Sequence, residues 1–271
     1  MELNLRGFDA KAYAYTGGKA FDAALPCVVF IHGALHDHSV WTLLARWFAH
    51  HGHGVLAVDQ PGHGRSGGAP LASVEVLADW LLSLLDAAGV AKASLVGHSM
   101  GSLIALEAAA RAPERAEALV MIGTAYPMKV SEALLETART APLKAIDMVN
   151  VFSHSTLAAK PSHPGPGTWL HGANRALMRR VQAGQTAVNL FHHDFGVCDR
   201  YAGGLEAAAK VTCRVSMILG ERDQMTVPRQ SREIAVALKA RVHTVAAGHA
   251  QMTEAPDAVL AALREALPTL R

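Results

Sequence analysis

Three residue types that together can form a hydrolytic triad occur in this chain in one characteristic order. GHSMG at 97–101 sets Ser99 between two glycines, and Asp223 and His249 follow later in the chain. A serine hydroxyl is a weak nucleophile unless a neighbouring base takes its proton. A histidine can act as that base when a carboxylate holds its tautomer and stabilises its charged form. The chemistry that these residues indicate is covalent hydrolysis through an acyl-enzyme.

Each of these residues also has a simpler interpretation. The pattern G-x-S-x-G arises by chance, and glycine and serine are common in turns. Asp223 could cap the following helix, Glu221 is a rival acid two residues away, and His249 could be a satisfied surface histidine. Their joint occurrence in the order Ser, Asp, His favours the triad.

The elements around the triad residues place them at one edge of a predicted sheet. KASLVGHS leads into Ser99 and an alanine-rich helix follows, which is the strand–turn–helix context of a nucleophile elbow. Asp223 and His249 also follow apolar runs of strand length. Alternating strand and helix patterns predict a parallel sheet with helices on both faces. The strand patterns cover 27–33, 54–64, 92–99, 116–124, 213–223 and 240–250, and helical patterns include 38–52, 73–89 and 228–240.

Acyl transfer also needs N–H donors for the negative charge that builds on the substrate oxygen. Met100, at the start of the helix after Ser99, is expected to supply one backbone N–H. The loop in FIHGAL is expected to supply the second, from Ala34. Both assignments rest on position alone, since backbone donors leave no side-chain signature.

The strand–helix rhythm breaks after Tyr126. Residues 127–205 carry helical patterns, a loop KPSHPGPGTW at 160–169, and no obvious buried strand. Because open α/β sheets bind ligands at the carboxyl edge of their strands, we expect a helical cap there; ordinary core helices are the alternative. The predicted domains are a core of 1–126 and 206–271 and a cap of 127–205.

Composition narrows the function classes. The 271 residues hold 25 Lys and Arg against 23 Asp and Glu with no basic patch, which argues against nucleic acid as a partner. No apolar stretch reaches the length of a membrane span. The first residues show no signal-peptide pattern, so we expect a cytoplasmic protein that acts on a small-molecule substrate, as a monomer or homodimer.

Cysteine and histidine usage gives no cofactor signature. The three cysteines are odd in number and their spacing matches no metal or redox pattern, which favours reduced thiols. The 15 histidines cluster, notably in HHGHG at 50–54, but no acidic or cysteine ligands accompany them at usual spacings. We therefore expect no metal and no cofactor.

Five motifs together resemble the α/β-hydrolase superfamily. The resemblance implies the α/β-hydrolase fold, a mostly parallel eight-stranded sheet with a helical cap insertion, and the triad Ser99, Asp223 and His249. It also implies that His32 and the DQPGHGRS loop shape the floor and rim of the site. The motifs are HGALHDHSVW (32–41), DQPGHGRSGG (59–68), GHSMGS (97–102), LGERDQMTVP (219–228) and AGHAQMTEAPDAV (247–259).

The chain departs from the superfamily pattern at two positions. Ser102 stands where many relatives carry a second glycine, and Gln251 stands where relatives often have an apolar residue. Both touch the packing behind the pocket and neither removes chemistry. The serine at the elbow argues against epoxide and haloalkane hydrolysis, since those relatives use an aspartate there.

The substrate is the least determined part of the site. HDH at 36–38 resembles cofactor-free dioxygenases of the same fold, so His36 or His38 could orient a heteroaromatic substrate or simply start the next helix. The residues expected to contact substrate are His32, His36, His38, His98, Trp169 and His192; Met128, Phe152 and Phe191 are further candidates for the pocket lining.

The sequence thus predicts a serine hydrolase that cleaves an ester, thioester or activated C–C bond of a small, largely apolar substrate. Cofactor-independent oxygenation or acyl transfer is the first alternative, because the same triad serves those chemistries on this fold. A ligand-binding receptor or pseudo-enzyme with an intact triad is the second.

Overall fold

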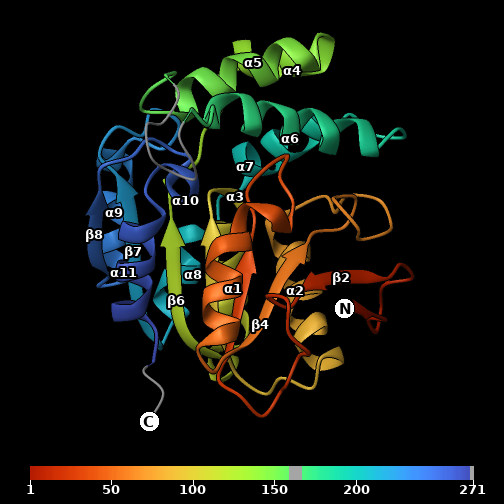
Figure 1. Cartoon of the computed structure of the whole chain (residues 1–271), viewed down its shortest axis with the longest axis vertical. Coiled ribbons are helices and arrows are strands. Elements are labelled where there is room, and N and C mark those ends of the chain that lie inside the picture. Colours follow the sequence, from red (N-terminus) through yellow and green to blue (C-terminus); the bar gives the residue numbers. More distant parts are fainter. Residues whose placement is uncertain (159–166, 269–271) are drawn as a thin grey trace.

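One eight-stranded sheet forms the centre of the molecule in the computed structural model, which describes residues 1–158 and 167–268 (Figure 1). The strand order is β1-β2-β4-β3-β5-β6-β7-β8. β3 to β8 run parallel, whereas β1 and β2 pair antiparallel at one edge. The strands are β1 (Glu2–Leu3), β2 (Ala12–Tyr15), β3 (Cys27–Ile31), β4 (Gly54–Asp59), β5 (Ala93–His98), β6 (Ala116–Ile122), β7 (Arg214–Gly220) and β8 (Arg241–Val245).

Helices cover both faces of this sheet. α1 (Thr42–His50), α10 (Gln251–Glu254) and α11 (Pro256–Ala266) lie over one face. The other face is covered by α2 (Val74–Ala87), α3 (Met100–Arg111), α8 (Gly204–Lys210) and α9 (Arg232–Ala237). The described residues also form the short 3-10 helices η1 (His38–Trp41), η2 (Pro113–Arg115) and η3 (Pro228–Ser231). This arrangement confirms the predicted fold class.

The central strands are continuous apolar runs because both of their faces are covered. All five residues of β3 (CVVFI) are buried. On the α1 face, Phe30 packs against Trp41 and Phe48, with ring centroids 5.1 and 5.9 Å apart. Such a core fixes the height of each strand and therefore the position of the residue that follows it.

Most strand and helix expectations agree with the structure in place and type. α2 begins after Ser73, whose side chain accepts from the Val76 N–H, and the chain leaves it at Gly89 with a φ of +70°. The predicted strand 240–250 is shorter, because the chain turns away after Val245 and the remainder forms the loop that carries His249. β1 and β2 had no counterpart among the strand patterns, since two and four residues are too few to show a period.

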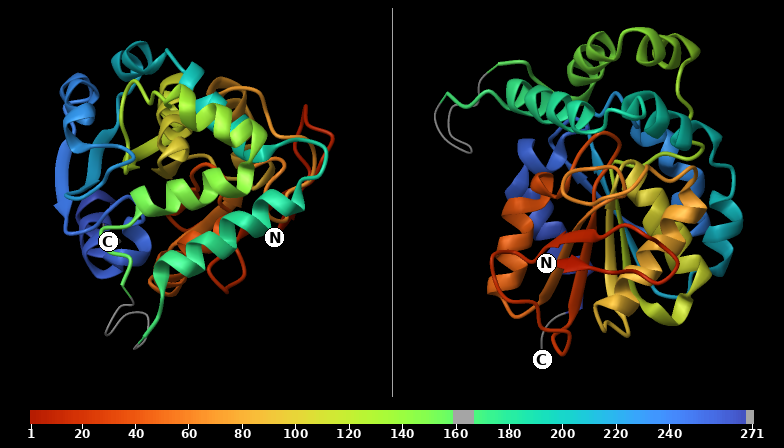
Figure 2. Two further views of the ribbon diagram at one scale, coloured as in Figure 1. Left: turned by 90° about the horizontal axis from the view of Figure 1, so that it is seen from above. Right: turned by 90° about the vertical axis from the view of Figure 1, so that its right-hand side faces the viewer.

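In the described parts of 127–205, four helices lie over the carboxyl ends of the parallel strands (Figures 1 and 2). They have an apolar cluster of their own, which includes Ile146, Val149 and Phe191 and also takes in Leu35 from the core. Residues 160–166 of the predicted loop are outside the described residues. The helices are α4 (Glu132–Thr140), α5 (Pro142–Ser153), α6 (Leu170–Gly184) and α7 (Leu190–Arg200).

The two glycines of GHSMG let α3 approach the sheet at contact distance. A Cβ at Gly97 would lie 2.1 Å from the Gly101 carbonyl oxygen, and one at Gly101 would lie 2.3 Å from the Ile31 oxygen. The obstacles are backbone atoms, which cannot move aside as a flexible side chain can. The glycines are therefore required by packing, whatever the serine between them does.

We expect Gly101→Ala to lower the free energy of unfolding by about 1–3 kcal/mol, because the added methyl group pushes α3 from β3. Thermal denaturation measures the change. Gly184→Ala is the matched control, since a Cβ there meets nothing within 4 Å. Equal melting temperatures for the two variants would contradict the packing argument.

Candidate active site

Ser99 occupies a strained corner between β5 and α3. Its φ is +52°, a left-handed value that is uncommon outside glycine. The corner is held by hydrogen bonds from the Ser99 N–H to the Ile122 oxygen, at 2.9 Å, and from the Ser102 N–H to the Ser99 oxygen, at 2.8 Å. Such a conformation costs on the order of 1–3 kcal/mol and persists where its surroundings enforce it. The geometry is that of a nucleophile elbow.

Asp223 and His249 are joined directly. Asp223 Oδ2 lies 2.8 Å from His249 Nδ1, and both residues are buried. The carboxylate is fixed by the Met225 and Thr226 N–H groups at 2.8 Å and by the Thr226 hydroxyl at 2.7 Å. The rival acid Glu221 is exposed. The structure therefore pairs the histidine with Asp223.

The carboxyl group of Asp223 is held in its charged form. Burial by itself raises its pKa, but the charge of His249 and the hydrogen bonds from His249 and Thr226 outweigh burial. The pKa therefore lies below the ordinary value of 3.8. A charged Asp223 accepts the His249 Nδ1–H and leaves Nε2 as the nitrogen able to take a proton.

The loop that carries His249 is tied to its surroundings at three points. The Gly248 N–H donates to Glu254 Oε2 at 2.6 Å, and the Ala250 N–H donates to the carbonyl oxygen of Ser153 in the cap at 2.9 Å. His98, next to Ser99, contacts the His249 carbonyl oxygen through Nε2 at 3.0 Å. Because a carbonyl only accepts, His98 Nε2 carries the hydrogen. Burial, and secondarily the proximity of His249, holds the pKa of His98 well below 6.5.

Ser99 and His249 line one cavity of about 280 Å³ beneath the cap. The core supplies all three histidines of the lining, His36, His98 and His249, and the cap supplies most of its apolar side chains together with Ser131 and Ser153. Lys129 is the one lysine among the described residues of the lining; its ammonium group is largely exposed and donates to the Asp199 carbonyl oxygen. The larger apolar side chains of the lining are Met128, Val130, Leu134, Met148, Val149, Phe152, Met178, Phe195 and Met225.

The turn that carries Ala34 reaches the same cavity. Ala34 lines it, and the backbone approaches the elbow so closely that a Cβ at Gly33 would lie 3.1 Å from the Ser99 Cβ. Met100 is the first residue of α3, so its N–H is free of intrahelical partners. The structure thus brings the positions of both predicted donors close to Ser99.

Two of the histidines expected near substrate line the cavity, namely His36 and His98. Nε2 of His36 lies 2.8 Å from Oδ1 of Asn174 in the cap. Asn174 Nδ2 in turn donates to Asn150 Oδ1 at 3.0 Å, and Asn150 Nδ2 donates to the Ile146 carbonyl oxygen at 3.1 Å. This chain fixes the hydrogen of His36 on Nε2 and leaves Nδ1 as an acceptor. Burial lowers the pKa of His36, which favours the same neutral form.

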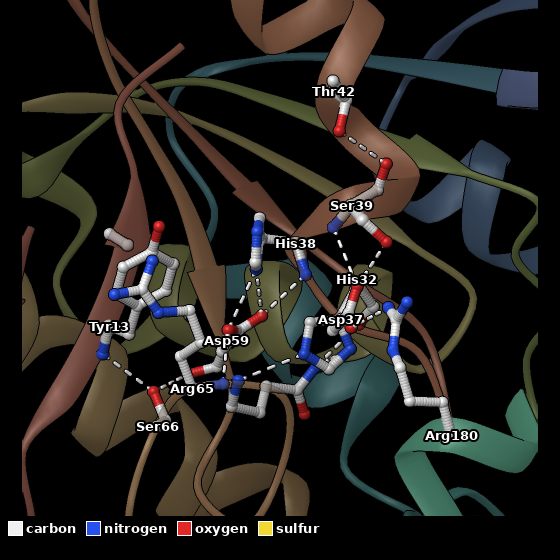
Figure 3. Close-up of polar contacts among 12 residues, drawn as sticks. Tyr13, His32, Asp37, His38, Ser39, Thr42, Asp59, Arg65, Ser66 and Arg180 are labelled. Atoms are coloured by element: carbon white, nitrogen blue, oxygen red, sulfur yellow. Dashed lines mark hydrogen bonds and ion pairs between the residues drawn. The ribbon is translucent and has the colours of Figure 1, made fainter. Parts of the chain in front are cut away.

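His38 is not among the residues that line this cavity; its side chain points toward Asp59 (Figure 3). Its ring lies against Tyr13 and Tyr15, and Nδ1 lies 2.9 Å from Asp59. His38 also begins η1, after Asp37 caps that helix. Of the two interpretations of HDH, the helix start describes His38, whereas His36 faces the cavity.

His32, Trp169 and His192 are also absent from the cavity lining. His32 is buried beneath the turn, where it accepts from the Gln60 N–H and donates to the Gly33 oxygen; burial lowers its pKa to about 4. Trp169 is 49% exposed and donates to the Leu157 oxygen on the outside of the cap. His192 and the fully buried Phe191 lie on α7, away from the lining.

Among the residues that the structure describes, one group has ligand atoms spaced as a metal site would need. Atoms of Asp37, His38 and Asp59 lie within 4.8 Å of one another. Asp37 is already paired with Arg180 at 2.7 Å, and Asp59 accepts from the His38 and Arg65 N–H groups at 2.6 and 2.8 Å (Figure 3). Asp37 thus joins the start of η1 to the cap, and Asp59 joins η1 to the loop after β4.

Three residues of the site had no assignment from the sequence. Thr226 fixes the Asp223 carboxylate, and Asn174 contacts His36. Asp194 on α7 is buried and accepts from the Leu35 N–H at 2.8 Å. Thr226 lies within the quoted motif LGERDQMTVP and could have been found there, whereas the two cap residues belong to a segment without a motif.

The sequence and the fold place this chain in a known family. Residues 26–164 match the model of the alpha/beta hydrolase fold family, and the chain therefore belongs to that family. Over 98% of both chains, the structure superimposes on the enol-lactonase from Burkholderia xenovorans LB400 with a TM-score of 0.79 and 23% identity, a likeness of fold.

Two curated relatives match shorter stretches. The chain is 34% identical over 135 residues to the sn-1-specific diacylglycerol lipase ABHD11 of Mus musculus, which covers 49% of this chain and 44% of the lipase. It is 30% identical over 100 residues to (E)-2-((N-methylformamido)methylene)succinate hydrolase of Acinetobacter baylyi, covering 36% and 38%. The chain thus spans less than half the length of these relatives.

Among the described residues, no helix is both long and apolar enough to cross a membrane.

Proposed function

We propose that this protein is a serine hydrolase that cleaves an ester, thioester or activated C–C bond next to a carbonyl group. The observation that carries the proposal is the Asp223–His249 contact at 2.8 Å, beside an elbow serine that shares one cavity with the histidine. The lipase and hydrolase named above support the same reaction class, because both catalyse hydrolysis.

The reaction follows from the order of these groups. Ser99 Oγ attacks the substrate carbonyl carbon while His249 Nε2 takes the hydroxyl proton, and Asp223 stabilises the resulting imidazolium. The Ala34 and Met100 N–H groups hold the negative charge on the carbonyl oxygen. His249 then gives the proton to the leaving group, which departs and leaves an acyl-enzyme. Water attacks the acyl group, its proton passes through His249 to Ser99, and the acid is released.

The cavity favours a small substrate with an apolar acyl group. Its volume of about 280 Å³ is near the lower end of the range of small-molecule sites. Methionine and phenylalanine side chains dominate the lining, and methionine adapts readily to irregular ligands. The neutral His36 offers an acceptor at Nδ1, so a hydroxyl or N–H group on the substrate is accommodated at little cost.

Active-site labelling with a fluorophosphonate probe tests the proposal. We expect one adduct by intact mass, mapped to Ser99, and its loss in His249→Ala. A folded wild-type protein that takes no adduct and hydrolyses none of a panel of p-nitrophenyl esters and thioesters would overturn the proposed function.

Phe152 offers a test of the acyl pocket. It lines the cavity and is 45% exposed, so Phe152→Ala should enlarge the cavity without unfolding the cap. We expect kcat/KM for hexanoate relative to acetate esters to rise severalfold. The neighbouring Val151→Ala is the control, because Val151 is equally exposed and lies outside the lining. An unchanged chain-length preference in Phe152→Ala would place the acyl group elsewhere.

A further inference from the structure

The turn that carries the Ala34 N–H has a conformation that its own sequence does not favour. The turn spans 33–36 and is closed by the His36 N–H on the Gly33 oxygen at 3.3 Å. Leu35, at its third position, has a φ of +55°. Turns with positive φ at this position normally place glycine or asparagine there. Contacts from outside the turn must therefore hold the leucine.

The cap supplies those contacts. The Leu35 side chain is fully buried in the cap's apolar cluster beside Ile146 and Phe191. Its N–H donates to Oδ2 of Asp194, a buried residue of α7, at 2.8 Å. The cap thus contacts Leu35 of the turn through both the side chain and the backbone N–H of that residue.

The same carboxylate oxygen binds a histidine from the core. His63 Nε2 lies 2.8 Å from Asp194 Oδ2, and His63 Nδ1 lies 3.1 Å from the Pro61 carbonyl oxygen. A carbonyl only accepts, as does an ionised carboxylate, so both ring nitrogens carry hydrogen and His63 is a cation. His63 and Asp194 form a buried ion pair between the loop after β4 and α7.

The groups around the pair preserve its charges. Burial lowers the pKa of His63, but the charge and hydrogen bond of Asp194 outweigh it and raise that pKa above 6.5. Burial raises the pKa of Asp194, but His63, His193 and the Leu35 N–H hold it well below 3.8. Asp59 favours the His63 cation, and the ring of His32, 5.0 Å away, is neutral.

We propose that Asp194, together with His63, is a positioning residue of the oxyanion hole: it fixes Leu35 so that the adjacent Ala34 N–H points at the reacting carbonyl oxygen. The inference rests on the proposed function and adds a role for the cap. The Ala34 N–H is correctly oriented only when α7 is packed against the turn. A misplaced donor weakens binding of the developing oxyanion more than binding of the substrate, so the loss falls on kcat.

The test compares three aspartate variants with a p-nitrophenyl ester that the wild-type protein hydrolyses. We expect Asp194→Leu to lose about 10²–10³ in kcat, the effect of removing one oxyanion donor, with KM within about twofold. Asp194→Asn keeps a carbonyl oxygen for the Leu35 N–H and should lose less. Asp199→Asn is the matched control on α7, because Asp199 accepts from the Val130 N–H and does not touch the turn.

The pH dependence of kcat distinguishes two roles for the Asp194–His63 pair: positioning the turn that carries the Ala34 N–H, and merely stabilising the fold of the cap. Deprotonation of His63 removes the cation, so the pair is intact at low pH and is lost as pH rises through a His63 pKa above 6.5. Wild-type kcat should therefore fall on the alkaline side of that pKa. His63→Gln keeps a donor for Asp194 without a titrating group, and should retain most of the neutral-pH kcat without the alkaline fall.

The outcomes are distinct from those of the proposed function. A wild-type protein that fails to label at Ser99 overturns both proposals. If the wild-type protein is labelled and active, full kcat in folded Asp194→Leu, or an equal loss in Asp199→Asn, overturns the positioning role alone. If Asp194→Leu does not fold, the pH profiles of the other variants decide. A fall of kcat at alkaline pH that persists unchanged in His63→Gln and Asp194→Asn then overturns the positioning role.

Discussion

Replacing Ser99 with alanine is expected to lower kcat for ester hydrolysis by about 10⁶-fold, because loss of the nucleophile removes the covalent route. The substitution deletes one oxygen at the elbow and should leave the melting temperature nearly unchanged. Steady-state kinetics with a p-nitrophenyl ester, together with fluorophosphonate labelling, measure the effect.

Ser94→Ala is the matched control for this experiment. Ser94 lies on the same strand β5 and is buried, but it sits near the opposite end of the strand from the cavity. Its activity should match that of the wild-type protein. Hydrolysis that survives in Ser99→Ala would show that another group or a bound water performs the attack, and the mechanism proposed above would be wrong.

Replacing Asp223 with asparagine is expected to cost about 10⁴ in kcat with little change in KM. An amide in this place no longer requires the hydrogen of His249 to be on Nδ1, and it does not stabilise the imidazolium that forms during attack. The Met225 and Thr226 donors that hold the carboxylate also face an amide group, so its orientation becomes ambiguous. The pH–rate profile and kcat of the variant check this expectation.

Glu221→Gln provides the control for the aspartate variant. It makes the same chemical change two residues away, on an exposed side chain. We expect activity within about twofold of wild type, as for most surface substitutions. A large loss in Glu221→Gln with a small loss in Asp223→Asn would reverse the assignment of the acid.

Expectations from the sequence were most successful where local pattern and chain topology agree. Alternating strand and helix patterns predicted the parallel sheet, and every strand of β3 to β8 was found near its expected place. Since residues that follow parallel strands gather at one edge, the same patterns brought Ser99, Asp223 and His249 to one side of the molecule. The sequence patterns did not predict β1 and β2, because segments of two and four residues are too short to show a periodicity.

The sequence was a poor guide to which residues line the substrate cavity. His36 and His38 are two residues apart in one motif, yet the first lines the cavity and the second packs against Tyr13 and Asp59. Trp169 was a plausible pocket residue by type, but its side chain lies on the outer surface of the cap. Residue type does not determine which way a side chain points once a chain leaves regular structure.

The sequence by itself therefore determined the family, the sheet and the candidate triad. Glycine spacing and strand periodicity are local patterns, and the order of the motifs along the chain is read from the sequence directly. Only the tertiary structure decided between Asp223 and Glu221, set the cavity lining and revealed the contact of Asp194 with Leu35, which are 159 residues apart in the chain. Such contacts depend on how the cap packs on the core. Packing is decided by the shapes of many side chains at once, and no short motif records it.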